Sequence, residues 1–504
     1  MKNSYIKFIT FSIFSRAGRK SIMSFFKSDE SFLEKISIGA IGTQRVFSLL
    51  KNLGHHPIEL ERGSMNYKIW KRIKIKRIRV PDILCVDNGI RVESRAKTNL
   101  EITMSHSVSD PERGWDFGMK DDDYVALIVC NKSGENPINW TADDLVQFVS
   151  VKNLRISEKQ GQTVFIAPKG SQEGFESRIT WPTGLASSEG TITEIGKTIK
   201  YRTVLGRTNC IRLTKGGKAL SPLVSVGDKV VRNQILASVV SVKKTIPTNK
   251  VDATFFIENL SSMVLSERYA AAKALSYFNK SLVEKTLLTK LRDENEHIYV
   301  KLEAAASLSR FDNIEGYSFI QQCLADNYLQ NVLESVIVLA EIRTIDSCKI
   351  LCDVLLDEHH DPEIRASAAW GLGEQQNSMA LTAIIKSFNS VEENIRIEAA
   401  RALAKFTNLH SNDIFELFCK ANSNELPGIA WALSKSDSIS LDQLISNLVG
   451  TEFRQWISYI IGMQGEERYV AEIEKLKEHD SEVYFAATLL WKIITSWVYE
   501  LKEY

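Results

Sequence analysis

Residues 81–97 read PDILCVDNGIRVESRAK, and this stretch decides the fold of the N-terminal part of the chain. An apolar run at 83–86 precedes the turn sequence DNG at 87–89, and an extended pattern restarts at Ile90, which is typical of a β-hairpin. Side chains alternate along a strand, so Glu93, Arg95 and Lys97 share one face, and the neighbouring strand brings Asp82 within reach of Glu93.

Two carboxylates in this arrangement predict a divalent metal site. Mg²⁺ or Mn²⁺ bound by Asp82 and Glu93 would meet hard oxygen ligands and keep several waters, one of which can attack a phosphodiester. The plainer interpretation is that both acids are solvated at the ends of their strands.

Pro81-Asp82 followed by Glu93-x-Arg95 resembles the PD-(D/E)xK nuclease superfamily over about residues 32–135. The resemblance implies an α/β nuclease-like fold in which Asp82 and Glu93 bind metal and a lysine two residues after the second acid acts on the water. This chain has Arg95 there, and arginine stays protonated in proteins. Lys97 lies one pleat further along the same face and is the candidate to replace that lysine. The catalytic set is therefore Asp82, Glu93, Arg95 and Lys97.

The residues around this motif fit the same fold and predict a nucleic-acid surface. Apolar residues at helical spacing over 38–50 predict a helix, residues 67–80 predict a strand with seven cations and no acid, and residues 124–130 predict a buried strand. A cationic strand beside a metal site suits a phosphate backbone, although such a charge run is also typical of a solvated strand face. A loop over 104–116 adds groups for proton transfer and stacking. The predicted nucleic-acid-binding residues are Lys68, Lys71, Arg72, Lys74, Lys76, His106 and Trp115.

A β-rich segment follows, over about residues 151–250. Residues 222–237, PLVSVGDKVVRNQILA, resemble the barrel-sandwich hybrid hairpin of biotinyl and lipoyl domains. Lys243 and Lys244 lack the Met- or Ala-flanked turn of a carrier lysine, so a structural module is favoured over a swinging-arm carrier.

The C-terminal half, residues 251–504, is repetitive. Aliphatic anchors recur at steps of 28 to 33 residues, and alanine-rich helices surround them, as in 270–275 and 398–403. Such a period predicts an α-solenoid, and its small residues resemble short HEAT repeats. Asp361-Pro362 predicts a helix start between repeats. The anchors are Leu275, Leu308, Leu339, Leu372, Leu403, Leu433, Ile461 and Leu490.

Composition limits the remaining possibilities. The 504-residue chain has a formal net charge of +1 and 44% hydrophobic residues, which predicts several folded domains. Its seven cysteines include no CxxC pair, and neither pair of adjacent histidines matches a metal signature. No segment reaches the length of a membrane span and none resembles a signal peptide, so we expect a cytoplasmic protein with a dispensable extension at 1–31. The predicted domains are 1–31, 32–150, 151–250 and 251–504.

Two functions from different classes follow from these observations. In the first, the chain is a metal-dependent DNA endonuclease, or a DNA-binding protein derived from one, in restriction or anti-phage defence. In the second, it is a catalytically inactive HEAT-repeat scaffold for protein or nucleic-acid partners, and Arg95 favours this alternative. An assembly factor similar to the repeat-containing phycobilin lyases is a third possibility that depends on the solenoid alone.

Overall fold

The computed structural model describes residues 29–65, 73, 78–107, 110–134, 137–167, 177–436, 439, 444 and 453–464. These residues form two compact units. The described residues of 23–69 and 76–312 make the first unit, and Ile73 with the described residues from Asn313 onward makes the second. The fold-class prediction is confirmed in its coarse form, because the N-terminal part is rich in sheet and the C-terminal part is helical. None of the described helices combines the length and the apolar character needed to cross a membrane.

A five-stranded sheet forms the centre of the first unit. Neighbouring strands of this sheet pair antiparallel, except for β3 and β5, which pair parallel. The predicted hairpin is confirmed as β2 and β3, joined by a turn in which Gly89 has φ +70° and a Cβ would lie 2.4 Å from the Phe255 ring. The sheet order is β1 (Pro57–Glu59), β2 (Ile83–Cys85), β3 (Arg91–Lys97), β5 (Tyr124–Asn131) and β6 (Thr141–Ser150).

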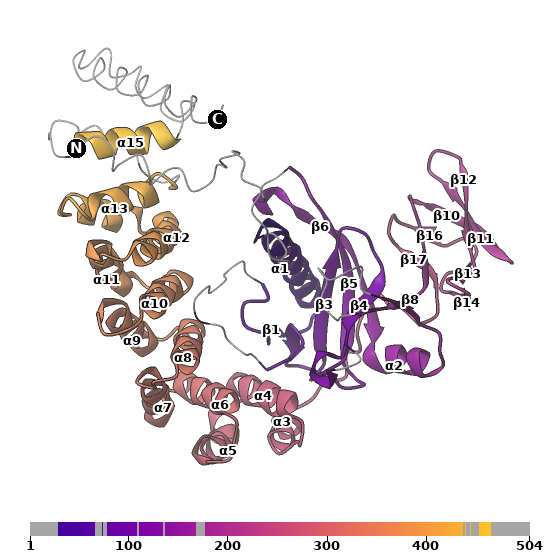
Figure 1. Cartoon of the computed structure of the whole chain (residues 1–504), viewed down its shortest axis with the longest axis horizontal. Coiled ribbons are helices and arrows are strands. Elements are labelled where there is room, and N and C mark those ends of the chain that lie inside the picture. The colour runs from indigo at the N-terminus through magenta and orange to yellow at the C-terminus, as the bar shows by residue number, and fades with distance from the viewer. Residues whose placement is uncertain are drawn as a thin grey trace, which may run out of the picture. The chain divides into compact units, whose positions relative to one another are not determined.

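Helix α1 (Asp29–Asn52) covers one face of this sheet (Figure 1). Val46 and Leu50 pack with Val92 in a buried apolar cluster, and Gly42 lets the helix approach Ala96 of β3 closely. The helix is longer than the predicted 38–50. The hairpin face that carries residues 83, 85, 92 and 96 is therefore apolar.

A second buried cluster covers the opposite face. Val125, Leu127 and Val129 of β5 pack there with Trp115 and Trp181. The covering elements are the helix α2 (Val151–Lys159) and a three-stranded sheet in the order β4 (Ile102–His106), β8 (Ser177–Trp181) and β7 (Val164–Ile166). The predicted loop at 104–107 is thus wrong in part, since residues 102–106 are a strand that pairs with β8.

The strand that pairs with β2 was not predicted from the sequence. Residues 57–59 form this strand, whereas the predicted basic strand 67–80 lies almost entirely outside the described residues, which include only Ile73 and 78–80 there. A three-residue strand has too short a pattern to be recognised from sequence alone. It is a strand mainly because it pairs with β2.

The β-rich module after 182 contains a separate two-stranded sheet of β13 and β14 and two larger sheets over one apolar core, which includes Ile192, Tyr201 and Leu236. One sheet has the order β12-β11-β10-β16 and the other β15-β17-β9, and they do not close into a barrel within the described residues. The strands are β9 (Thr183–Leu185), β10 (Gly190–Ile195), β11 (Thr198–Thr203), β12 (Thr208–Arg212), β13 (Thr214–Lys215), β14 (Lys218–Ala219), β15 (Ser221–Pro222), β16 (Lys229–Val230) and β17 (Ile235–Ser238).

Paired helices follow, as the repeat period predicted. The first unit contains α3 (Ala253–Asn259), α4 (Leu265–Ala274), α5 (Lys280–Arg292) and α6 (Ile298–Arg310). The second contains α7 (Ile314–Leu324), α8 (Leu329–Ile342), α9 (Ile345–Leu356), α10 (Pro362–Gln375), α11 (Leu381–Lys386), α12 (Glu393–Phe418), α13 (Leu426–Leu433) and α15 (Arg454–Gln464). Within that unit α8, α10 and α12 pack in succession (Figure 1). The predicted helix start is confirmed, since the Asp361 side chain caps α10 and Pro362 is its first residue.

Candidate functional site

Asp82 and Glu93 lie across from each other at the start of the hairpin. The strand register pairs Ile83 with Val92 and Leu84 with Arg91, so one further step places Asp82 opposite Glu93. Directly opposed residues have Cβ atoms about 5 Å apart. The Ser94 N–H donates to Asp82 Oδ2 at 2.7 Å, which holds this carboxylate beside β3.

Asp82 is buried and Glu93 is partly buried, and the environment of both carboxyl groups favours the protonated form. Burial raises the pKa of Asp82 well above 3.8, and the charges of Glu93 and Glu61 raise it further. Burial also raises the pKa of Glu93, against the lowering effect of Arg95 and Arg79. Acids held close together with raised pKa values are typical of functional sites, because the fold stores repulsion that a cation can relieve.

Arg95 already supplies part of this neutralising charge. Its guanidinium Nη2 lies 2.9 Å from Glu93 Oε1, and the Glu93 side chain is 14% exposed. Register pairs Glu93, Arg95 and Lys97 with Val125, Leu127 and Val129, so the three share the sheet face away from α1, as the alternation predicted.

Lys97 lies at the far end of the same row. Its Nζ donates to the carbonyl oxygens of Thr103 at 2.8 Å and Glu101 at 3.2 Å. Burial lowers its pKa to about 8, with the cations Arg95 and Arg178 acting in the same direction. A lysine that titrates near neutrality can accept a proton, but in this structure its amine is directed at the turn before β4.

The other predicted binding residues do not gather around this pair. Trp115 is a core residue whose indole N–H donates to Glu158 Oε2 at 2.8 Å and whose ring meets Trp181 edge-on. With 4% of the residue exposed, Trp115 presents no ring face to a base. His106 ends β4, near the Phe165 ring. The cations Lys68, Lys71, Arg72, Lys74 and Lys76 lie outside the described residues.

Two buried arginines link the sheet region to the first repeat helices. Arg91 makes a two-point contact with Asp123, at 3.0 and 2.6 Å, and donates to Ser266 Oγ of α4. Arg62 meets Glu303 of α6 at 2.5 Å, with side chains 2% and 0% exposed. A charge is buried at low cost only with its partner, so these contacts fix the candidate face to α4 and α6 within the first unit.

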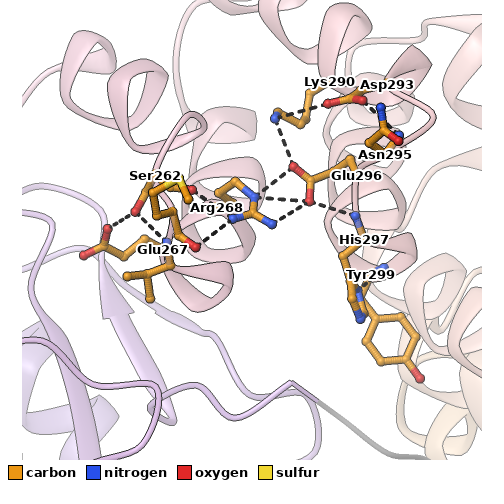
Figure 2. A network of polar contacts seen from close by, with 11 residues as sticks. Ser262, Glu267, Arg268, Lys290, Asp293, Asn295, Glu296, His297 and Tyr299 are labelled. Atoms are coloured by element: carbon orange, nitrogen blue, oxygen red, sulfur yellow. Dashed lines mark hydrogen bonds and ion pairs between the residues drawn. The ribbon is translucent and has the colours of Figure 1, made fainter.

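A third polar network lies between the repeat helices themselves (Figure 2). Glu296 accepts hydrogen bonds from Arg268 of α4, from Lys290 of α5 at 2.9 Å and from the His297 N–H at 2.8 Å. Burial opposes its ionisation, yet the hydrogen bonds from Arg268 and Lys290 hold the pKa of Glu296 below 4.5. The acceptor positions of the Glu296 carboxylate are all used within the network, which indicates that the network stabilises the packing of these helices.

A further cluster lies behind the hairpin turn, and no spacing in the sequence indicated it. His55, Cys85 and Asp87 bring a ring nitrogen, a thiol and a carboxylate oxygen within 4.8 Å of one another. Residues 55 and 85 are thirty positions apart and match no ligand spacing, so only the packing of the α1 end against β2 makes the cluster visible.

Comparison with known proteins supports the repeat assignment. The HEAT repeats family matches residues 349–425. No curated protein matches the chain. Among solved structures, the CpcE–CpcF complex of phycocyanin lyase from Nostoc sp. PCC7120 is 16% identical, with 49% of this chain and 96% of that one covered and a TM-score of 0.24. Human deoxyhypusine hydroxylase is 15% identical, with 42% and 83% covered and a TM-score of 0.19. An engineered protein is 17% identical, with 49% and 97% covered and a TM-score of 0.18. The repeat assignment therefore depends on the family match and the helix pairs.

Proposed function

We propose that this chain is a HEAT-repeat scaffold that binds a protein partner. The observation that carries the proposal is a row of exposed apolar side chains at the start of successive second helices. Ile314 begins α7, Ile345 begins α9, and Met379 lies in the 3₁₀ turn before α11, with exposed fractions of 77%, 57% and 46%. Repeat proteins bind through such extended surfaces, and grouped exposed apolar residues are typical of protein interfaces.

Site-specific photo-crosslinking tests the scaffold. A photoreactive residue at position 345 of the full-length chain, in its native cell, should capture a discrete protein. The control is position 204, where Val204 is equally apolar and 79% exposed but belongs to the β module. Equal capture at both positions, or none at 314, 345 and 379, would contradict the proposal.

A second candidate function is metal-dependent hydrolysis of nucleic acid, and the facing pair Asp82 and Glu93 favours it. The donor set fits Mg²⁺ or Mn²⁺, since both carboxylates are buried side by side and acceptor-only when ionised. The ion would supply Lewis acidity and an activated water. Arg95 would stabilise charge on the phosphate, and Lys97 would take up a proton.

Cleavage assays separate the two functions. Supercoiled and linear DNA are incubated with the full-length chain, with Mg²⁺, with Mn²⁺ or with neither. Metal-dependent cutting should disappear in Asp82→Ala and Glu93→Ala but persist in Asp116→Ala, which removes a carboxylate paired with Arg155 outside the site. Gel shifts without cutting, weakened by neutralising Lys71, Lys74 and Lys76 and by added salt, would support nucleic-acid binding alone.

A further inference from the structure

We propose that His55, Cys85 and Asp87 form a binding site for a zinc-class divalent ion, separate from the carboxylate pair. His55 follows the end of α1, Cys85 ends β2, and Asp87 begins the turn of the hairpin. Their potential ligand atoms all lie within 4.8 Å of one another. His55 and Cys85 are buried, and the Asp87 side chain is 21% exposed, so Asp87 is the member of the cluster that faces solvent.

The donor set selects the class of ion. Imidazole nitrogen, thiolate and carboxylate oxygen are the three ligand types that zinc accepts, and three protein ligands leave one coordination position open. Magnesium and calcium prefer oxygen ligands alone, so the cysteine excludes them. Co²⁺ shares the tetrahedral preference in such sites and serves as a visible probe.

The separations agree with tetrahedral coordination. Bonds of about 2.0–2.3 Å at tetrahedral angles place ligand atoms roughly 3.4–3.6 Å apart. His55 Nδ1 and Asp87 Oδ2 are 3.1 Å apart, within a few tenths of an ångström of that separation. The thiol sulfur lies within 4.8 Å of one ring nitrogen of His55 and one carboxylate oxygen of Asp87, so it would need to move by about 1 Å at most toward those atoms.

Neighbouring hydrogen bonds already orient the ligands. The His56 N–H donates to Asp87 Oδ1 at 2.8 Å, which leaves Oδ2 directed at His55. Asn88 Nδ2 donates to the Pro247 carbonyl oxygen at 2.8 Å and also lies 3.3 Å from His55 Nδ1, so an ion bound at this nitrogen would replace the second contact and leave the first. The His56 N–H on Asp87 is an outer partner of the kind that fixes ligand orientation in metal sites.

The site lies on the other side of the hairpin from the carboxylate pair. Cys85 packs in the apolar cluster under α1, whereas Asp82 shares its face with Leu84 and Arg91 by the strand alternation. A bound ion would therefore tie the end of α1 to the turn of the hairpin without contacting Asp82 or Glu93.

Cobalt titration of the full-length chain, first stripped with a chelator, tests the site. We expect sulfur-to-cobalt charge transfer in the near ultraviolet and intense tetrahedral d–d bands that saturate at about one equivalent. Zn²⁺ should abolish both signals and Mg²⁺ neither. Cys85→Ser should remove the charge-transfer band, and Cys130→Ser, at another buried cysteine of the same sheet, should retain it.

The Asp87→Asn variant keeps the shape of the turn and provides an independent measurement if Cys85→Ser does not fold. It should weaken Co²⁺ binding at least about ten-fold. The proposal is overturned if the wild-type chain shows no charge transfer, if the band persists in Cys85→Ser, or if Asp87→Asn binds Co²⁺ as tightly as the wild type. Each outcome is independent of DNA cleavage and of partner capture.

Discussion

Replacing Lys97 with methionine should stabilise the sheet at pH 7 and destabilise it at pH 10.5. In the folded chain burial lowers the pKa of Lys97 from 10.5 to about 8. Its charged form is therefore disfavoured by the fold at neutral pH. Methionine has a similar length and no charge, so it fills the same half-buried position without that penalty.

The magnitude follows from the pKa and from two hydrogen bonds. A lowering from 10.5 to about 8 corresponds to roughly 3 kcal/mol against the ammonium form. The folded state binds this proton less tightly than the unfolded state, so the penalty is complete below about pH 8 and disappears as pH rises to 10.5. Losing the bonds to the Glu101 and Thr103 carbonyls costs about 1 kcal/mol each. Lys97→Met should thus be about 1 kcal/mol more stable at pH 7 and about 2 kcal/mol less stable at pH 10.5.

Urea unfolding at the two pH values measures this difference. Pulse alkylation of Cys85, which is 0% exposed in β2, reports the opening of the sheet that contains Lys97. Lys159→Met, at an exposed position near the end of α2, controls for the loss of a surface lysine. The stability difference between Lys97→Met and the wild type should change by roughly 3 kcal/mol between the two pH values.

A difference that stays constant within about 1 kcal/mol would refute the reasoning. It would mean that the Lys97 amine is hydrated in the folded chain, and the argument that it can accept a proton near neutrality would fail with it.

Three further predictions concern the same unit. Asp82→Asn should raise the melting temperature, measured by calorimetry, at pH 7.5 but hardly at pH 4. Burial and a neighbouring carboxylate raise the pKa of Asp82, so the contribution of this acid to stability falls as pH rises. An equal shift of the melting temperature at both pH values would contradict this prediction. Arg62→Met should lower the unfolding free energy by about 3–5 kcal/mol because Glu303 stays buried without its partner, and adding Glu303→Met should recover most of the loss in chemical denaturation. Gly42→Ala should destabilise by about 1–3 kcal/mol, since its Cβ would lie 2.3 Å from a side chain of β3. Gly39→Ala on the same helix meets nothing within 4 Å and should stabilise by about 0.5–1 kcal/mol in the same denaturation assay.

The repeats were predictable because their signal is local and recurs. Helices at 265–274, 298–310 and 362–375 surround the anchors that the period identified, and each alanine-rich face serves the same packing in every repeat. A helix contains its own hydrogen bonds, so its sequence pattern needs no distant partner to be recognised.

Short strands were harder to predict for the converse reason. Residues 57–59 and 102–106 are strands because β2 and β8 supply their hydrogen bonds. Their own patterns are too short to distinguish them from loops. The local patterns predicted the hairpin and the strand at 124–130, but they did not indicate which segment would pair with β2.

The sequence by itself determined the hairpin and the shared face of residues 93, 95 and 97, since a turn and a two-residue alternation are local properties. Tertiary structure decided the chemistry on that face. The register across the turn sets Asp82 opposite Glu93, and the packing of β4, β8 and α4 determines which charges are buried. Tertiary contact also brought His55 to Cys85 and Asp87, because ligand distances and desolvation depend on neighbours that are far away along the chain.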